Sequence, residues 1–194
     1  VRGNGAILVN HDGVRFANEM LTRDKLSEAI LAQTGKSAFL IFDQSVRESL
    51  AAIENYSQQG LLTTAGSASD LAQALKLPVS SFVETMDKYQ EYQATGEDLE
   101  FGRKGDEMPR PLTQAPFYAI EVEPVLHHTM GGIKINSNAE VVNKSGNPVP
   151  GLYAAGEVTG GVHGGNRLGG NAVADIIVFG QIAGTSAVNY SKRQ

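Results

Sequence analysis

The chain has 194 residues, a formal net charge of −5 and 41% hydrophobic residues, so it can bury a substantial core in one domain or two small ones. Lysine and arginine are scattered rather than gathered in a stripe, which argues against a nucleic-acid surface, and the lack of cysteine excludes disulfides, thiolate metal ligands and cysteine nucleophiles. No apolar run approaches the roughly 20 residues that cross a bilayer, so we expect a soluble protein without membrane insertion.

The first part of the chain shows strand and helix signals in alternation. Apolar residues recur at helical spacing in several segments, and glycine, proline and capping residues mark their ends. The expected elements, in chain order, are a hairpin at 6–16 with a two-residue Asp12-Gly13 turn, a helix from Thr22 or Asp24 to Gly35, a buried strand at 38–42, a helix capped by Ser45 with Glu48, a helix from Ser69 or Asp70, and a helix from Ser80 or Ser81. Residues 95–111 are polar and rich in glycine and proline, so a surface loop is expected there.

The pattern changes after Pro116, where short strands replace helices. The expected strands and final helix are 117–122, 132–135, 140–142, 152–155 and 170–190. We place a boundary near His127. The predicted fold class is α+β, with a mixed α/β module followed by a glycine-rich module of strands and one helix. The chain opens at Val1 inside a fold-like pattern without an initiator methionine or a leader, so we expect a piece of a longer protein.

Glu157 follows a hydrophobic strand and a glycine turn in the segment 151–157. A glutamate at the carboxyl end of a strand can accept hydrogen bonds from sugar or ribitol hydroxyls. An ordinary strand that ends in a turn explains the same residues equally well.

Arg167 stands just before the last predicted helix, in the glycine-rich segment 166–172. Helix N-terminal N–H groups suit an anion or the electron-rich edge of a flavin, and an arginine offers a planar fork for a carboxylate. An isolated arginine at a helix start more often faces solvent. The flanking glycines weaken that interpretation, because they cost helix stability unless something needs close approach.

His127 and His128 precede Thr129 and two glycines. One histidine can donate to a carboxylate while the other contributes only backbone. A zinc site is disfavoured, because no third ligand lies at a useful spacing and no HExxH motif occurs. His163, in a second glycine-rich stretch, fits either a pocket lining or a plain loop.

Arg2, Glu19 and Arg23 fall within one predicted hairpin and helix start, so they can stand near each other. From the residues alone, a solvated face with one salt bridge is the favoured interpretation of this group.

Five segments in this order resemble the C-terminal part of the flavoprotein subunit of soluble fumarate reductases, especially the flavocytochromes c. They are 2–10, 15–24, 127–132, 151–157 and 160–172. The resemblance spans essentially the whole chain, and five motifs in order are far more specific than one.

The resemblance implies a mobile clamp, or capping, domain for residues 1–127 and the returning C-terminal part of a Rossmann-like FAD-binding domain for residues 128–194. It implies an oxidoreductase with non-covalent FAD that acts on fumarate or another unsaturated carboxylate. Electrons would come from a donor domain or protein, for which a haem domain outside this chain is one form. The resemblance favours the periplasm over the cytoplasm.

The resemblance also implies roles for individual residues by motif match. Arg23 would supply a proton to one alkene carbon, and Arg2 would belong to the relay that feeds it. His127 and Arg167 would hold a substrate carboxylate and polarise the alkene. The expected FAD contacts are Glu157 and the backbone around His128, Thr129, Asn171 and Ala172.

Two features depart from the family pattern. The G-x-G-x-x-G fingerprint and its acid, which hold the ADP half of FAD, do not occur in the sequence. The relay and substrate residues expected just before Arg2 are also missing. We therefore expect the isolated chain neither to hold FAD stoichiometrically nor to reduce fumarate.

Three alternatives stay open at this point. The substrate can be another 2-enoate, such as urocanate or an acrylate-type acid. The chain can also be a clamp module without activity of its own. An oxidase or dehydrogenase acting on aspartate or a ketosteroid is disfavoured, because Arg23 and Arg167 together favour an alkene that carries a carboxylate.

Overall fold

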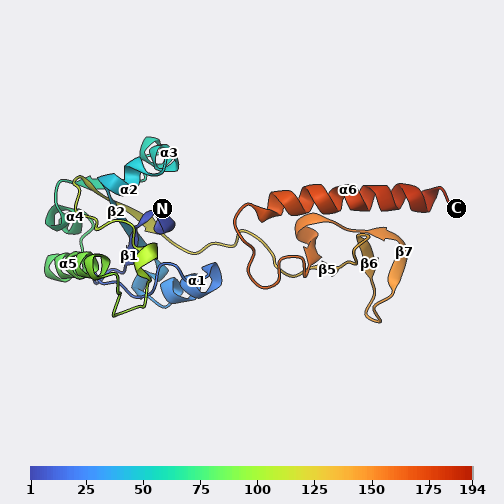
Figure 1. The fold of residues 1–194 in the computed structure, drawn as a ribbon, viewed down its shortest axis with the longest axis horizontal. Helices are drawn as coiled ribbons and strands as arrows, with labels where there is room; N and C mark the ends of the chain where they lie inside the picture. Colours follow the sequence, from blue (N-terminus) through green and yellow to red (C-terminus); the bar gives the residue numbers. More distant parts are fainter. Residues whose placement is uncertain (194) are drawn as a thin grey trace. The chain divides into compact units, whose positions relative to one another are not determined.

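The computed structural model describes residues 1–193 and divides into two compact units, Val1–Pro124 and Val125–Gln194. The break falls close to the boundary expected near His127. Helices and strands are mixed in the first unit, and short strands with one long helix make up the second (Figure 1). The predicted α+β class is confirmed.

The first unit is built on a four-stranded antiparallel sheet in the order β1-β2-β4-β3. Its strands are β1 (Ile7–Val9), β2 (Ala38–Asp43), β3 (Thr63–Ala65) and β4 (Phe117–Val122). All six residues of β2 are buried, as the uninterrupted apolar run at 38–42 predicts for a central strand. Leu40 of β2 pairs with Leu8 on one side and with Ile120 on the other.

Five helices surround this sheet (Figure 1). They are α1 (Arg23–Leu31), α2 (Gln44–Glu48), α3 (Ala52–Gln58), α4 (Ala68–Ala74) and α5 (Val79–Thr95), and short 3₁₀ turns occur at η1 (Arg2–Asn4), η2 (Thr34–Lys36) and η3 (Gly105–Glu107). The longest, α5, buries Phe82, Met86 and Tyr89 in the core. These residues recur at helical spacing, which is why the sequence predicted the helix.

Several predicted ends and caps are wrong by a few residues. Asp43, not Ser45, caps α2: its carboxylate accepts from the Val46 N–H at 3.1 Å, and Ser45 lies inside the helix. Ser67 caps α4 by accepting from Asp70 N. In each case a side chain just outside the helix reaches the free N–H groups of its first turn, which residues inside the helix do not.

The hairpin after β1 has a three-residue loop rather than the predicted two-residue turn. Gly13 N donates to Asn10 O at 3.0 Å, and Asn10 N donates to Val14 O at 2.9 Å. Gly13 has a φ of 76°, a left-handed conformation that this loop type assigns to glycine.

The expectation of a surface loop at 95–111 is also wrong for its most important residues. Asp98, Arg103 and Met108 are buried, and Arg103 is one of the largest fully buried side chains in the described residues. The loop is polar because it carries charges that pair inside the fold.

The second unit has two small sheets and a long helix. β5 (Ile133–Lys134) pairs in parallel with β8 (Thr159–Gly160), and β6 (Glu140–Val142) pairs antiparallel with β7 (Pro148–Tyr153). The helix α6 (Asn171–Ser191) packs on β7 and on the 3₁₀ turn η4 (Gly156–Val158).

Helix α6 corrects one sequence-based expectation. By length and composition alone it is long and apolar enough to cross a membrane, whereas the sequence was interpreted as lacking such a run. The core helix of a soluble protein meets the same criteria. Large apolar side chains of α6 stand exposed, namely Val173, Ile176, Ile177, Val178 and Val188.

Candidate functional site

Arg2 and Glu19 belong to one buried cluster in the first unit. Arg2 is half-buried, and its Nη1 donates to the Glu19 carbonyl at 2.6 Å. The Glu19 carboxylate is fully buried and accepts from Arg15 Nε at 2.9 Å and from Arg103 Nη1 at 3.1 Å. The favoured interpretation of a solvated face with one salt bridge is therefore wrong.

Arg23 is the first residue of α1 and is exposed. Burial lowers the pKa of Arg2, and the positive charge of Arg23 lowers it further, against the opposing effect of Glu19. A guanidinium in this setting gives up a proton more readily than a free arginine does.

Three members of the cluster were not predicted from the sequence: Arg15, Asp98 and Arg103. Arg15 Nη2 donates to Glu19 Oε2 and to Asp98 Oδ2, each at 2.8 Å. Asp98 lies 83 residues from Arg15 in sequence, so no local pattern indicates the pair. The only available signal was the four-residue spacing of Arg15 and Glu19, which outside a helix says little.

In the second unit, Glu157 lies in η4, shortly after β7. Its Oε1 accepts from the Thr129 N–H at 3.0 Å, and the Thr129 hydroxyl donates to the Glu157 carbonyl at 3.2 Å. His128 Nδ1 is 3.7 Å from Glu157 Oε2. About half of the Glu157 side chain stays exposed, which leaves carboxylate surface for a further hydrogen-bond donor.

His163 lies at the edge of the same group. Its Nε2 is 3.1 Å from Asp175 Oδ2, and its ring meets the His128 ring edge-on with centroids 5.6 Å apart. The structure therefore ties His163 to α6, a choice that the sequence left open. Asp175 was not singled out from the sequence, although a lone acid in the first turns of an apolar helix is a usable signal.

Arg167 is 6% exposed, so the solvent-facing interpretation is wrong. Its Nη1 donates to the Leu168 carbonyl at 3.2 Å, and its buried Nε has no partner among the described residues. Asn171 and Ala172 open α6 after Gly170, and no side chain caps that helix end in the described part of the chain. This leaves a buried guanidinium and uncapped N–H groups beside one another in sequence.

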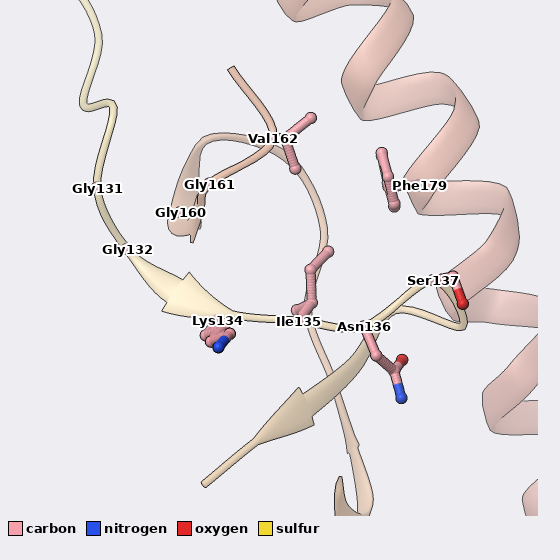
Figure 2. Close-up of a pocket in the computed structure, with 10 residues that line it drawn as sticks. All are labelled: Gly131, Gly132, Lys134, Ile135, Asn136, Ser137, Gly160, Gly161, Val162 and Phe179. Carbon is pink, nitrogen blue, oxygen red and sulfur yellow. The ribbon is translucent and has the colours of Figure 1, made fainter. Parts of the chain in front are cut away.

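Glycines bring two backbone segments of the second unit into close contact. A Cβ on Gly132 would collide with the Val158 carbonyl, and one on Gly160 would collide with the Gly132 backbone. A cavity of about 660 Å³ adjoins this crossing. Figure 2 shows the glycine backbone on one side of it and Phe179 of α6 on another. None of the predicted site residues lines it.

His127 is exposed, and no hydrogen bond to its side chain is found within residues 1–193. The structure thus brings Arg2 near Arg23 in one unit, and Glu157, His128 and Thr129 together in the other. Within the described range, no group of three His, Asp or Glu side chains could hold a metal ion.

The residues of the second unit fit part of an FAD site. The unpartnered Nε of Arg167 and the uncapped start of α6 suit an electron-rich group, and the half-exposed Glu157 carboxylate suits a hydroxyl. Glycines at the crossing of β5 and β8 keep the backbone there free of side chains. The G-x-G-x-x-G loop that would bind the ADP half of FAD does not occur in this sequence.

Comparisons with known proteins agree with this fit. The model of the family described as FAD binding domain matches residues 1–173. The chain is 54% identical over 193 residues to a fumarate reductase (cytochrome) of Shewanella frigidimarina, covering 100% of this chain and 34% of that protein. It is 32% identical over 191 residues to a urocanate reductase of Eggerthella lenta, covering 95% of this chain and 31% of that one.

One solved structure, the open conformation of a flavocytochrome c3 fumarate reductase, is similar with a TM-score of 0.76 and 46% identity. The match covers 97% of this chain and 33% of the other. The chain thus spans about a third of the length of the curated relatives it matches. With its family match over most of its residues and its similarity to flavocytochrome fumarate reductases, the chain belongs to the FAD binding domain family.

Proposed function

We propose that the chain is part of an FAD-dependent reductase of an unsaturated dicarboxylate, with fumarate as the preferred substrate. The observation that carries the proposal is the half-buried Arg2 beside the cationic Arg23, together with the buried Arg167. Similarity to a fumarate reductase over the whole chain supports the substrate class. In this proposal, residues 1–127 form the clamp and residues 128–194 contribute to the FAD-binding domain.

Reduced FAD, when bound, supplies a hydride to one alkene carbon. Arg23 donates a proton to the other carbon, and Arg2 returns a proton to Arg23. An arginine is an unusual acid, because its pKa normally exceeds about 12. It can act here because a carbanion is a far stronger base, and because Arg2, whose own pKa is lowered by burial and by the charge of Arg23, can return a proton to it.

His127 and Arg167 bind a substrate carboxylate. The Arg167 guanidinium, positioned by its bond to the Leu168 carbonyl, stabilises the negative charge that develops toward that carboxylate. Glu157 and Thr129 hold the cofactor side of the site, with backbone of His128, Asn171 and Ala172.

The decisive experiment replaces Arg23 by lysine in the intact flavoprotein that carries this segment. We expect reduction of fumarate to be nearly abolished while FAD stays bound, because lysine is shorter and carries its charge at a point. Lys25→Arg, an exposed change on the same helical turn, serves as the control. Retention of most activity by Arg23→Lys would remove Arg23 from this role.

The second candidate substrate class is another 2-enoate, favoured by the 32% identity to a urocanate reductase. A panel of fumarate, urocanate and acrylate, each reduced with a viologen donor, distinguishes these. If kcat/KM is higher for urocanate or acrylate than for fumarate, the preferred substrate is that compound and not fumarate.

We also propose that the 194-residue chain alone is inactive and binds FAD weakly, because it lacks the loop that holds the ADP half. Flavin absorbance of the purified chain tests this directly, and a stoichiometric amount of bound flavin contradicts it.

The proposed electron donor is a domain or protein outside this chain, with haem as its cofactor, in the periplasm. Haem absorbance in a periplasmic extract of the intact protein is the corresponding measurement.

A further inference from the structure

We propose that Glu19 and Arg103 are positioning residues, which hold Arg2 and the turn before Arg23 in the geometry of proton delivery. The inference rests on the proposed function, in which Arg2 and Arg23 pass the proton. It concerns two side chains that touch neither substrate nor cofactor in that proposal.

Arg2, Glu19 and Arg103 form a closed hydrogen-bonded ring. Arg2 donates to the Glu19 carbonyl at 2.6 Å, Arg103 Nη1 donates to the Glu19 carboxylate at 3.1 Å, and Arg103 Nη2 donates to the Arg2 carbonyl at 3.1 Å. The Arg2 guanidinium is thereby fixed to the Glu19 backbone, and the Arg2 backbone to the Arg103 side chain, which also holds the Glu19 carboxylate. A half-buried arginine held in this way has few alternative rotamers.

The ring is locked into the core by neutralising partners. Arg15 bridges Glu19 and Asp98, and the Tyr89 ring lies 5.6 Å from the Arg15 guanidinium and 5.8 Å from that of Arg103. Buried ion pairs are often no more stabilising than apolar residues of similar volume. Their benefit here is a fixed geometry, which suits an Arg2 side chain that must pass a proton to Arg23.

The loop of residues 98–103, which carries Asp98 and Arg103, also holds the turn that leads to Arg23. Asn18 Nδ2 donates to the Phe101 carbonyl at 3.4 Å, and Leu21 N donates to Asn18 O at 3.2 Å. Helix α1 then begins at Arg23. Loop 98–103 therefore contacts the supports of both proposed proton-transfer residues.

A matched control exists in the same region. Arg110 Nη1 donates to the Asn4 carbonyl at 2.8 Å and so also supports the first segment, but no hydrogen bond joins it to Arg2 or Glu19 in the described residues. Arg110→Lys removes a comparable contact without opening the ring.

The test compares Arg103→Lys, Glu19→Gln and Arg110→Lys in the full-length flavoprotein with FAD bound. Steady-state kinetics give kcat and KM for fumarate, and hydrogen exchange gives the protection of peptides 1–9 and 17–24. A misplacement on the order of 1 Å costs about 100-fold in rate. We expect Arg103→Lys and Glu19→Gln to lose about 10- to 100-fold in kcat with KM within about threefold, and to exchange faster in both peptides.

Arg110→Lys should keep kcat and the protection of 17–24. If Arg103→Lys and Glu19→Gln match this control in kcat, the positioning role is refuted, while loss of activity in Arg23→Lys would still support the proposed function. If neither variant folds, hydrogen exchange in the unmodified protein tests the positioning role instead. The Leu8 N–H, which donates to Glu19 Oε1 at 3.2 Å, and the Leu21 N–H must then open together, and independent opening overturns the inference.

Discussion

Tyr89 offers a sharp test of the buried cluster in the first unit. Its side chain is fully buried, its hydroxyl donates to the Gly5 carbonyl at 3.1 Å, and burial raises its pKa from 10.0 to about 12. The folded state therefore keeps the phenol protonated at a pH where the unfolded chain has lost the proton. Stability from this group is complete below pH 10 and is lost as the pH rises toward 12.

The size of this loss of stability follows from the difference between the pKa of Tyr89 in the folded and unfolded states. Each pKa unit is worth about 1.4 kcal/mol, so raising the pH through this interval removes on the order of 2–3 kcal/mol of unfolding free energy. Tyr89→Phe has no proton to lose, but it leaves the buried Gly5 carbonyl without its donor, which costs about 1–3 kcal/mol. The variant should be less stable than the parent near neutral pH, and the gap should close or reverse at high pH.

Urea unfolding of the 194-residue chain, followed by far-ultraviolet circular dichroism at a series of pH values, measures both effects. Other groups titrate in the same interval, so the difference between parent and variant is the informative quantity. Tyrosinate absorbance of the folded parent gives an independent titration. A stability gap that stays constant from neutral pH to pH 12 would refute the reasoning.

Three further predictions concern other parts of the chain. Burial tends to raise the pKa of Asp98, but its hydrogen bond to Arg15 outweighs this and holds the pKa below 3.8, so urea stability should fall as the pH drops below that value, and Asp98→Asn should flatten the fall. Equal acid slopes would contradict this. Asp43→Ala removes the cap of α2 and should cost about 1–2 kcal/mol, and an unchanged urea midpoint would show that the cap contributes nothing. Gly132→Ala places a methyl group against the Val158 carbonyl and should lower FAD content in the intact flavoprotein; full FAD occupancy speaks against the close crossing.

Elements whose pattern is local were predictable from the sequence. The apolar run of β2 and the helical spacing of α5 and α6 specify their conformation within a few residues of chain, and the structure confirms them. The predicted ends of several helices were less accurate. At α2, Asp43 and Ser45 both suit a cap, and only the path of the chain leaving β2 decides between them.

The cluster around Glu19 could not be predicted, because its contacts join distant segments. Arg103 lies 84 residues from Glu19 and 101 from Arg2, and the polar, glycine-rich surroundings of Arg103 resemble a surface loop. Burial of Arg167 was missed for a related reason. A glycine-rich segment before a helix has the same composition whether it is packed or solvated.

The proposed function depends most on Arg23 and Arg167 acting on one substrate. An experimentally determined structure of the full-length flavoprotein with FAD and a bound dicarboxylate measures this directly. We predict that the Arg167 guanidinium lies about 3 Å from a substrate carboxylate and that Arg23 points a nitrogen at an alkene-derived carbon. If the two guanidinium groups face separate outer surfaces, with neither near the dicarboxylate, the proposed chemistry is wrong.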